Sequence, residues 1–340
     1  MYALEWDRDM NYDIIIIGAG PAGLACGLTL ARAGKKCLIL ERRRELTGKV
    51  CGDGLSSHCM QVLKNINIQE KDLISLGGKK IYRNVTSNFG EIEERRYCRN
   101  EGYEDYAYGL SRDVFDGYLL RLAREAGCEV MTDRTVLSVR KNGSGYLVDG
   151  SLTADRVVLA CGAIGGQKLG VAKPDDVPVG MSARVYGDCR LPSDTFYFKY
   201  DWQYGEGYAW LFPVGERLWN YGVWSADRRE EVKRLFAEFE EQMKKTYFSD
   251  CSYERKPKGA VIGATRHMPT DGTKIPRIGD CAYISCFESG EGISYAIESG
   301  RLQAEAILHD RDPEKVPVPE KNAYANEVKK CHLKSFEMIL

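Results

Sequence analysis

A glycine-rich turn between a buried strand and a helix constrains the fold of this chain more than any other feature. The run YDIIII at residues 12–17 is continuously apolar and β-branched, which is typical of a strand buried on both faces. GAGPAG follows at 18–23, and an apolar helical pattern then continues to Gly34. A second apolar run, KKCLILE at 35–41, predicts the next strand. Together these segments predict a β-α-β unit within an α/β fold.

Four residues of this unit have the identities that dinucleotide binding requires. Gly18 permits the tight turn after the strand, Gly20 lets the backbone approach a pyrophosphate, and Gly23 allows the helix to pack closely. Glu41, at the end of the second strand, can accept hydrogen bonds from the adenosine ribose hydroxyls. We therefore predict a dinucleotide site, although this unit alone does not separate NAD from FAD.

A second glycine-rich segment, far along the chain, favours FAD. Gly279 and Asp280 follow a predicted strand, and Gly290, Gly292 and Ile293 open a predicted helix. An aspartate placed there can bind a ribityl hydroxyl, and a helix N-terminus attracts a flavin carbonyl or a phosphate. An NAD site is completed within one Rossmann-like domain, whereas a long, extended FAD suits a second, distant contact.

Charge and cysteine content argue against several other functions. The chain has 48 Lys and Arg against 49 Asp and Glu, so its net charge of −1 gives no electrostatic reason to bind nucleic acid. Its 12 cysteines form no C-x-x-C pair and only four histidines are present, so we expect no metal site. Charged residues at the start and glycines within the longest apolar stretch argue against a signal peptide and a membrane span. We expect reduced thiols and a cytoplasmic protein.

A change in composition predicts a second domain. Aromatic residues dominate residues 179–225, and their alternation predicts a mostly antiparallel sheet. We assign 179–257 to a substrate-binding domain. Residues 1–178 and 258–340 are assigned to a discontinuous, Rossmann-like FAD-binding domain.

Three aromatic residues of the second domain are candidates for a substrate wall. Tyr208, Trp210 and Phe212 alternate along one predicted strand and should therefore share a face. Pro213 is expected to end this strand or to mark its edge. Ordinary core packing is the alternative reading of the same three residues.

Several of these motifs resemble one known family. GAGPAG, Glu41, KVCGDGLS at 49–56, SRDVFDGYLLRLAREAG at 111–127, GDCAYISCFESGEGI at 279–293 and YAWLFP at 208–213 resemble the geranylgeranyl reductase family of FAD-dependent oxidoreductases. That family shares the p-hydroxybenzoate hydroxylase fold. The resemblance implies hydride transfer from flavin N5 to a carbon–carbon double bond of an apolar, isoprenoid-like substrate. It also implies an electron donor such as NADPH or ferredoxin, a redox partner, and peripheral contact with a membrane.

The resemblance further implies roles for individual residues. Arg112 would hold the pyrophosphate or ribose region of FAD, and Val136 would meet the adenine through its backbone. Arg42 and Lys49 would lie along the adenosine and the loop that leads to the flavin. Cys51 would sit beside the isoalloxazine or the substrate entrance, where it is a catalytic candidate. A surface salt bridge for Arg112 and a purely structural loop role for Cys51 are the alternatives.

One further catalytic candidate and three departures from the family pattern complete the prediction. Tyr208 is a candidate proton source for the second carbon, with a structural hydrogen bond as the alternative. The family's A-D-G-x-x-S is replaced here by a segment that contains Cys161, Tyr283 replaces a usual glycine, and Phe287 replaces a usual proline. His58 is interpreted as a surface-loop residue.

Two other functions compete with alkene reduction. YAWLFP partly resembles the Trp-x-Trp-x-Ile-Pro string of flavin halogenases, so a class A flavin monooxygenase or a halogenase is the alternative. A non-catalytic flavin electron carrier is the second alternative. The chemistry of the product would separate the three.

Overall fold

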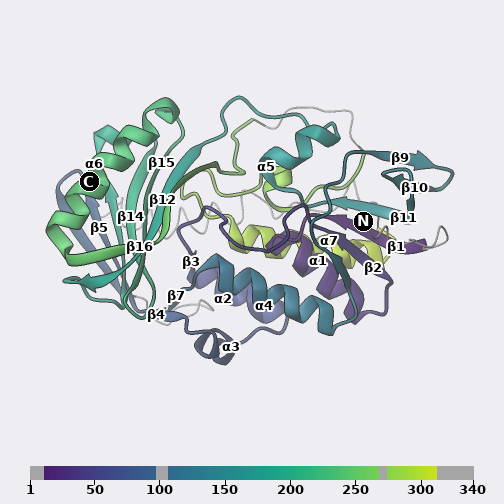
Figure 1. The fold of residues 1–340 in the computed structure, drawn as a ribbon, viewed down its shortest axis with the longest axis horizontal. Coiled ribbons are helices and arrows are strands. Elements are labelled where there is room, and N and C mark those ends of the chain that lie inside the picture. Colours follow the sequence, from purple (N-terminus) through teal and green to yellow (C-terminus); the bar gives the residue numbers. More distant parts are fainter. Residues whose placement is uncertain (1–10, 97–105, 268–273, 312–340) are drawn as a thin grey trace, which may run out of the picture.

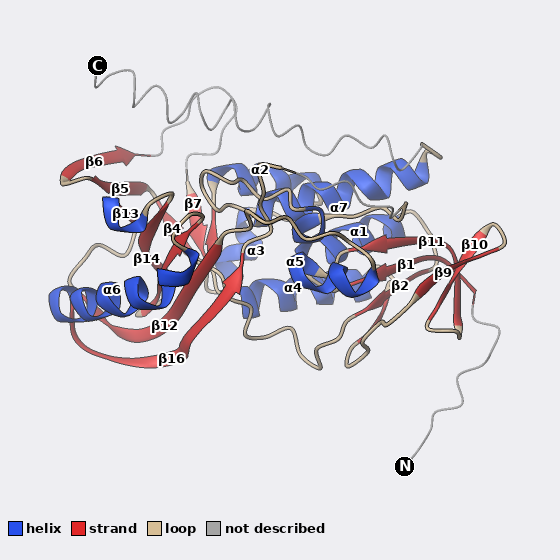
Figure 2. Ribbon diagram, turned by 90° about the horizontal axis from the view of Figure 1, so that it is seen from above, coloured by secondary structure: helices blue, strands red, loops and turns tan. Residues whose placement is uncertain are grey.

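Two β-sheets lie toward opposite ends of the molecule, with four helices between them (Figures 1 and 2). The computed structural model describes residues 11–96, 106–267 and 274–311; the end of the predicted FAD-binding domain, 312–340, lies outside the described residues. The four helices are α1 (Pro21–Arg32), α2 (Ser57–Asn65), α4 (Arg112–Glu125) and α7 (Ile293–Leu308). This mixed architecture confirms the predicted fold class.

The first sheet contains the predicted β-α-β unit. Its strands run in the order β8 (Glu129–Met131), β2 (Cys37–Leu40), β1 (Asn11–Ile17), β11 (Leu152–Leu159), β10 (Gly145–Val148) and β9 (Val139–Asn142). The first four are parallel, and β10 pairs antiparallel with both β11 and β9. Ile14 and Ile16 pack toward the helices, whereas Ile15 and Ile17 pack into the opposite face. Burial on both faces explains why the sequence of β1 is continuously apolar.

Small residues bring the second glycine-rich segment against the first. A Cβ at Gly300 of α7 would lie 2.2 Å from the carbonyl oxygen of Ala22 in α1, and one at Gly279 would lie 2.8 Å from the Ala22 Cβ. Neither position has room for a side chain. Segments that are far apart in the sequence therefore meet at the start of α1.

The second sheet has one face toward α6 (Val232–Tyr247) and one toward the rest of the molecule. Its strands run in the order β16 (Phe248–Val261), β12 (Val179–Cys189), β15 (Leu218–Ser225), β14 (Gly207–Gly215), β13 (Thr195–Tyr200), β5 (Arg83–Asn88) and β6 (Glu91–Arg96). Ala209, Leu211 and Tyr221 pack with apolar side chains of α6. Tyr208, Trp210 and Phe212 pack in a separate cluster on the other face.

This second sheet extends beyond the predicted range 179–257. Strands β5 and β6 belong to it, because β5 pairs in parallel with β13, and β16 continues to Val261. Because the paired strands β5 and β13 are far apart in the sequence, no local sequence pattern predicts that they pair. Pro213 does not end β14, which continues to Gly215, although the β13 pairing stops at Leu211 and the register with β15 shifts after Pro213.

A small third sheet joins the two larger ones. It consists of β3 (Gly54–Leu55), β7 (Ala107–Gly109) and β4 (Lys79–Ile81). A Cβ at Gly109 would lie 1.8 Å from the carbonyl oxygen of Pro213, so β7 packs directly against β14. The remaining helices are α3 (Glu70–Ser75) and α5 (Gly162–Gly165), with short 3-10 turns at Gly166–Leu169, Trp202–Tyr204, Arg229–Glu231 and Gly279–Ala282. Of the helices described, none is both long and apolar enough to cross a membrane.

Candidate functional site

The glycine turn between β1 and α1 has the shape that a dinucleotide requires. Gly18 has φ of +113°, and a Cβ there would lie 2.3 Å from the carbonyl oxygen of Ala160. A Cβ at Gly23 would lie 2.0 Å from the carbonyl oxygen of Gly18, whereas nothing lies within 4 Å of a Cβ at Gly20. The turn is therefore closed on its protein side and open at Gly20, in front of the positive end of α1.

Glu41 stabilises this turn from the end of β2. Its buried carboxylate accepts hydrogen bonds from the backbone N–H of Ala19 at 2.8 Å and of Arg43 at 2.9 Å. Each carboxylate oxygen keeps further acceptor capacity. The predicted contact of Glu41 with ribose therefore stays a prediction, and the position beside the turn fits it.

Asp280 lies beside the start of α1, in the turn at Gly279–Ala282. Its Oδ1 accepts a hydrogen bond from the Ser285 hydroxyl at 3.0 Å, and its Oδ2 lies 3.5 Å from Lys49 Nζ. Both charged side chains are partly exposed. Two residues that were predicted separately as cofactor contacts thus form one ion pair next to the glycine turn.

The start of α7 is fixed to the start of α2 by a partly buried carboxylate. Glu291, between Gly290 (φ +67°) and the helix N-cap Gly292, accepts a hydrogen bond from Ser56 at 2.6 Å and another from Ser294. His58 Nδ1 lies 3.9 Å from the same carboxylate. Burial alone would raise the pKa of Glu291, but His58, Ser294 and Ser56 together hold it below its ordinary value.

The interpretation of His58 as a surface-loop residue is wrong. His58 lies in α2 and is 7% exposed, because the carboxylate of Glu291 and the ring of Tyr295 (centroids 6.0 Å apart) enclose it. His58 and Glu291 were missed as a pair, since 233 residues separate them. The only sequence signal was a glutamate between two glycines at a helix start.

The segment Cys51–Gly54 crosses from the first domain onto the aromatic face of the second sheet. The carbonyl oxygen of Cys51 accepts hydrogen bonds from Asn220 Nδ2 at 2.7 Å and from the Ser182 hydroxyl at 3.1 Å. A Cβ at Gly52 would lie 3.2 Å from Trp210 Nε1, so the backbone itself contacts the aromatic wall. Burial raises the pKa of the Cys51 thiol, although Arg112 opposes this shift.

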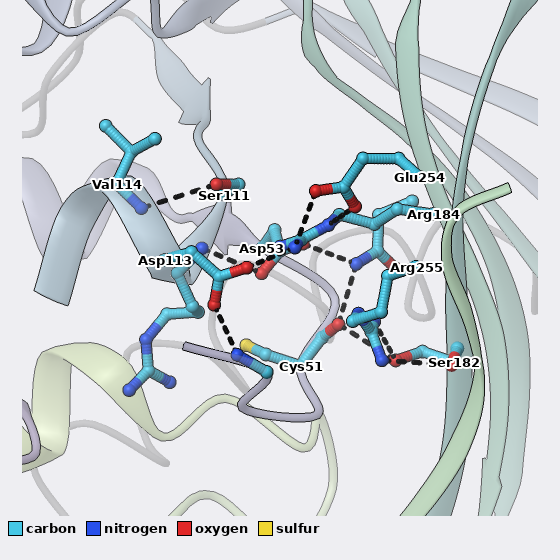
Figure 3. Close-up of polar contacts among 12 residues, drawn as sticks. Cys51, Asp53, Ser111, Asp113, Val114, Ser182, Arg184, Glu254 and Arg255 are labelled. Carbon is cyan, nitrogen blue, oxygen red and sulfur yellow. Dashed lines mark hydrogen bonds and ion pairs between the residues drawn. The ribbon is translucent and has the colours of Figure 1, made fainter. Parts of the chain in front are cut away.

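A buried ionic network, which the sequence reasoning missed, holds this segment in place (Figure 3). Asp53 is fully buried, with its carboxylate 3.3 Å from Arg184 Nη1 and 2.6 Å from Asn220 Nδ2. Arg184 also pairs with Asp113 at the start of α4 and, at 2.6 Å, with Glu254 of β16. Burial raises the pKa of Asp53, and Arg184 and Asn220 counter that shift. The network therefore ties the Cys51–Gly54 segment and α4 to the second sheet.

Arg112 forms a salt bridge, but a buried one and not the surface salt bridge that was the alternative to cofactor binding. Its Nε and Nη2 each lie 2.7 Å from a carboxylate oxygen of Asp116, one helical turn along α4. Both side chains are buried, so this is an internal pair and not a surface one. Contact of Arg112 with FAD stays a prediction.

The aromatic wall has the shared face that alternation predicted. Tyr208 donates its hydroxyl hydrogen to the carbonyl oxygen of Ser289 at 2.6 Å, and Trp210 Nε1 donates to Asn220 Oδ1 at 2.9 Å. Phe212 stacks against Phe196 with ring centroids 4.2 Å apart. The wall thus faces the Cys51–Gly54 segment and the loop before α7.

The other predicted contacts lie at the end of β2 or within the core. Arg42 is exposed directly after Glu41. Val136 is buried against the first sheet, and Ile293 is the buried first residue of α7. Tyr283 has φ of +51°, which explains why a glycine is usual at its position. The roles of these residues in FAD binding stay predictions.

Comparisons with known proteins agree with this geometry. Residues 11–155 match the family model described as FAD binding domain. The chain is 27% identical over 325 residues to digeranylgeranylglycerophospholipid reductase 1 of Methanococcoides burtonii, covering 90% of this chain and 78% of the relative. It is also 27% identical over 327 residues to menaquinone reductase of Mycobacterium tuberculosis, covering 89% and 78%.

Solved structures confirm the fold. A geranylgeranyl bacteriochlorophyll reductase-like protein from Thermoplasma acidophilum superposes with a TM-score of 0.73 at 22% identity, covering 94% of this chain and 83% of that chain. A flavin-dependent brominase superposes with a TM-score of 0.66 at 17% identity, covering 94% and 83%. The matched FAD binding domain, the curated relatives and the fold together confirm the predicted resemblance to the geranylgeranyl reductase family and indicate an FAD-dependent oxidoreductase.

Proposed function

We propose that this protein reduces a carbon–carbon double bond of an apolar, isoprenoid-like substrate. The observation that carries the proposal is the wall of Tyr208, Trp210 and Phe212, which faces the segment Cys51–Gly54 and the loop before α7. An apolar wall of this kind suits an alkene and excludes water. The proposed substrate-binding domain is 179–257 together with the added strands β5 and β6.

The residues around the glycine turn would hold FAD. Gly18, Gly20 and Gly23 with the start of α1 would bind the pyrophosphate, and Glu41 the adenosine ribose. Asp280, Gly290 and the start of α7 would bind the ribityl chain and the flavin ring. Bound FAD would supply the hydride, which is chemistry that amino-acid side chains do not provide.

Two side chains are proposed to supply the proton that completes the reduction. Burial raises the pKa of the Cys51 thiol, so the thiol keeps its proton at neutral pH. Burial likewise raises the pKa of Tyr208 well above its ordinary value, but its hydroxyl hydrogen is directed at Ser289. Cys51 is therefore the stronger candidate, and Tyr208 would have to turn away from Ser289 first.

The names of two relatives support a lipid substrate. One relative is named for a digeranylgeranylglycerophospholipid and another for menaquinone. We propose an apolar small molecule of this kind, with NADPH or ferredoxin as electron donor, in the cytoplasm with peripheral membrane contact.

A halogenase or class A monooxygenase is the second candidate. The observation that favours it is the brominase fold, which covers 94% of this chain. A flavin electron carrier is the third candidate. The apolar wall argues against a carrier, because a carrier does not need to bind an apolar substrate.

Anaerobic reoxidation of the reduced protein tests the proposal. The purified protein is reduced with dithionite under argon and mixed with a geranylgeranyl phospholipid, and flavin absorbance is followed. We expect oxidised flavin to return with this compound and not with its saturated analogue. Reoxidation that occurs only after oxygen is admitted would contradict the proposal and support the monooxygenase or halogenase.

A further inference from the structure

Two cysteines from distant parts of the chain meet beside the glycine turn. Cys161 Sγ and Cys281 Sγ lie 3.6 Å apart, although 120 residues separate them in the sequence. Cys161 is the N-cap of α5, and Cys281 lies in the turn at Gly279–Ala282. A disulfide requires the sulfur atoms to approach to about 2.0 Å, so the two sulfur atoms would have to move closer together than they are in this structure.

The two thiols differ in exposure and in pKa. The same differences separate an attacking cysteine from a resolving cysteine in thiol–disulfide exchange. Cys161 is partly exposed, and the hydrogen bond from Cys281 lowers its pKa. Cys281 is 1% exposed; its contact with Cys161 and its burial raise its pKa. A reactive thiol needs access and thiolate character, and of the two Cys161 has both.

The thiols in the core of the first domain do not share this arrangement. Cys37 and Cys128 are both buried, and burial raises the pKa of each to about 12. Cys128 Sγ contacts the carbonyl oxygen of Cys37, at 3.7 Å. These cysteines behave as small apolar side chains.

We propose that Cys161 and Cys281 form a thiol–disulfide exchange site for low-molecular-weight disulfides. The Cys161 thiolate attacks one sulfur of the small disulfide, forms a mixed disulfide and releases one thiolate. The Cys281 sulfur then attacks Cys161 Sγ and releases the second. The protein loses two electrons and the two thiol protons, and the small disulfide gains them and becomes two thiols.

The position of this site links it to the cofactor turn. A Cβ at Gly18 would lie 2.9 Å from the Cα of Cys161, and Cys281 directly follows Asp280. A Cys161–Cys281 disulfide would therefore join the segments on both sides of the glycine turn. Because it closes a long loop of the chain, the disulfide should stabilise the folded protein. The proposal does not depend on which reaction the flavin performs.

Peptide mapping tests the proposal directly. The purified, FAD-containing protein is incubated with oxidised glutathione, its remaining thiols are blocked with N-ethylmaleimide, and it is digested without reduction. We expect a linked pair of peptides that contains Cys161 and Cys281 and is lighter by two hydrogen atoms than their sum. The linked pair should disappear after dithiothreitol, and the melting temperature should be several degrees higher in the oxidised form.

Variants separate this site from general thiol oxidation. Cys161→Ser and Cys281→Ser should each abolish the linked pair, and Cys281→Ser should retain glutathione on Cys161. Cys189→Ser, which alters a partly exposed cysteine in the second sheet, should leave the linked pair unchanged. If Cys161 and Cys281 are recovered separately alkylated, or if glutathione stays on Cys161 in the unmutated protein, the proposal is wrong.

Discussion

The glycine turn at β1–α1 and the interface between Asp53 and the second sheet are two parts of the candidate site. They are built differently. The turn depends on residues that are close in the sequence, and Gly18 and Gly23 are required because the backbone leaves no space. The interface depends on an ion pair between Asp53 and Arg184, which are 131 residues apart. Local sterics thus shape the turn proposed to bind the cofactor, whereas long-range charge pairing fixes the segment beside the proposed substrate wall.

The largest expected effect of a single substitution lies in the interface. Arg184→Met should lower the free energy of unfolding by about 3–5 kcal/mol, because it leaves the Asp53 carboxylate buried without its cation. Arg121→Met, which breaks an exposed pair with Glu125, should change stability by less than about 1 kcal/mol. Urea unfolding of both variants measures the difference.

A double variant sharpens the same test. Asp53→Asn combined with Arg184→Met should be less destabilised than Arg184→Met alone, since no buried carboxylate remains unpaired. Equal stabilities for Arg184→Met and Arg121→Met would contradict the role given to the ionic network.

Two glycines of the turn offer a matched pair. Gly23→Ala should destabilise the protein by about 1–3 kcal/mol, because its methyl group would overlap the backbone of Gly18. Gly20→Ala should fold normally, since the space there is open, but should retain less FAD. Thermal unfolding and flavin absorbance after gel filtration check both. Full FAD retention by Gly20→Ala would show that this space is not the pyrophosphate site.

Asp280→Ala should weaken FAD binding about ten- to a hundred-fold without unfolding the chain. The physical reason is the loss of a charge-assisted hydrogen bond, worth about 1.5–3 kcal/mol. Asp155→Ala, an exposed aspartate of β11, is the control and should bind FAD normally. Unchanged FAD affinity in Asp280→Ala, measured by fluorescence titration, would remove Asp280 from the cofactor site.

A substitution in the aromatic wall should have a small effect on stability. Trp210→Phe should cost about 1 kcal/mol, because it removes the hydrogen bond to Asn220, but should reduce turnover much more than FAD binding. Trp219→Phe changes a tryptophan on the opposite face, packed against Phe248, and should leave turnover unchanged. If both variants lose turnover equally, the wall is core and not a substrate surface.

The part of the site that could be predicted is the part built from local signals. Gly18, Glu41 and Asp280 could be predicted as cofactor contacts because strand, turn and helix patterns place them at element ends, and their contact with FAD stays a prediction. Arg184 and Asn220 were missed, although a buried polar residue in a central strand usually has a specific partner. Their partner, Asp53, lies in the run CGDGLS, and nothing in the spacing of that run points to β12 or β15.

The aromatic residues of the second sheet could be predicted only in part from the sequence. Alternation correctly placed Tyr208, Trp210 and Phe212 on one face. It did not show that β5 and β6 complete this sheet, because the pairing of β5 with β13 depends on the whole fold. It also did not show that the Tyr208 hydroxyl contacts Ser289.

The mass of the product formed under argon tests the central claim most directly. The reduced protein is mixed with a polyprenyl compound in the absence of oxygen, and the mass of the extracted lipid is measured by mass spectrometry. We predict a product that is heavier than the substrate by two hydrogen atoms and that forms in the same amount without oxygen as with it. A product that contains oxygen or halogen and forms only in air would contradict it.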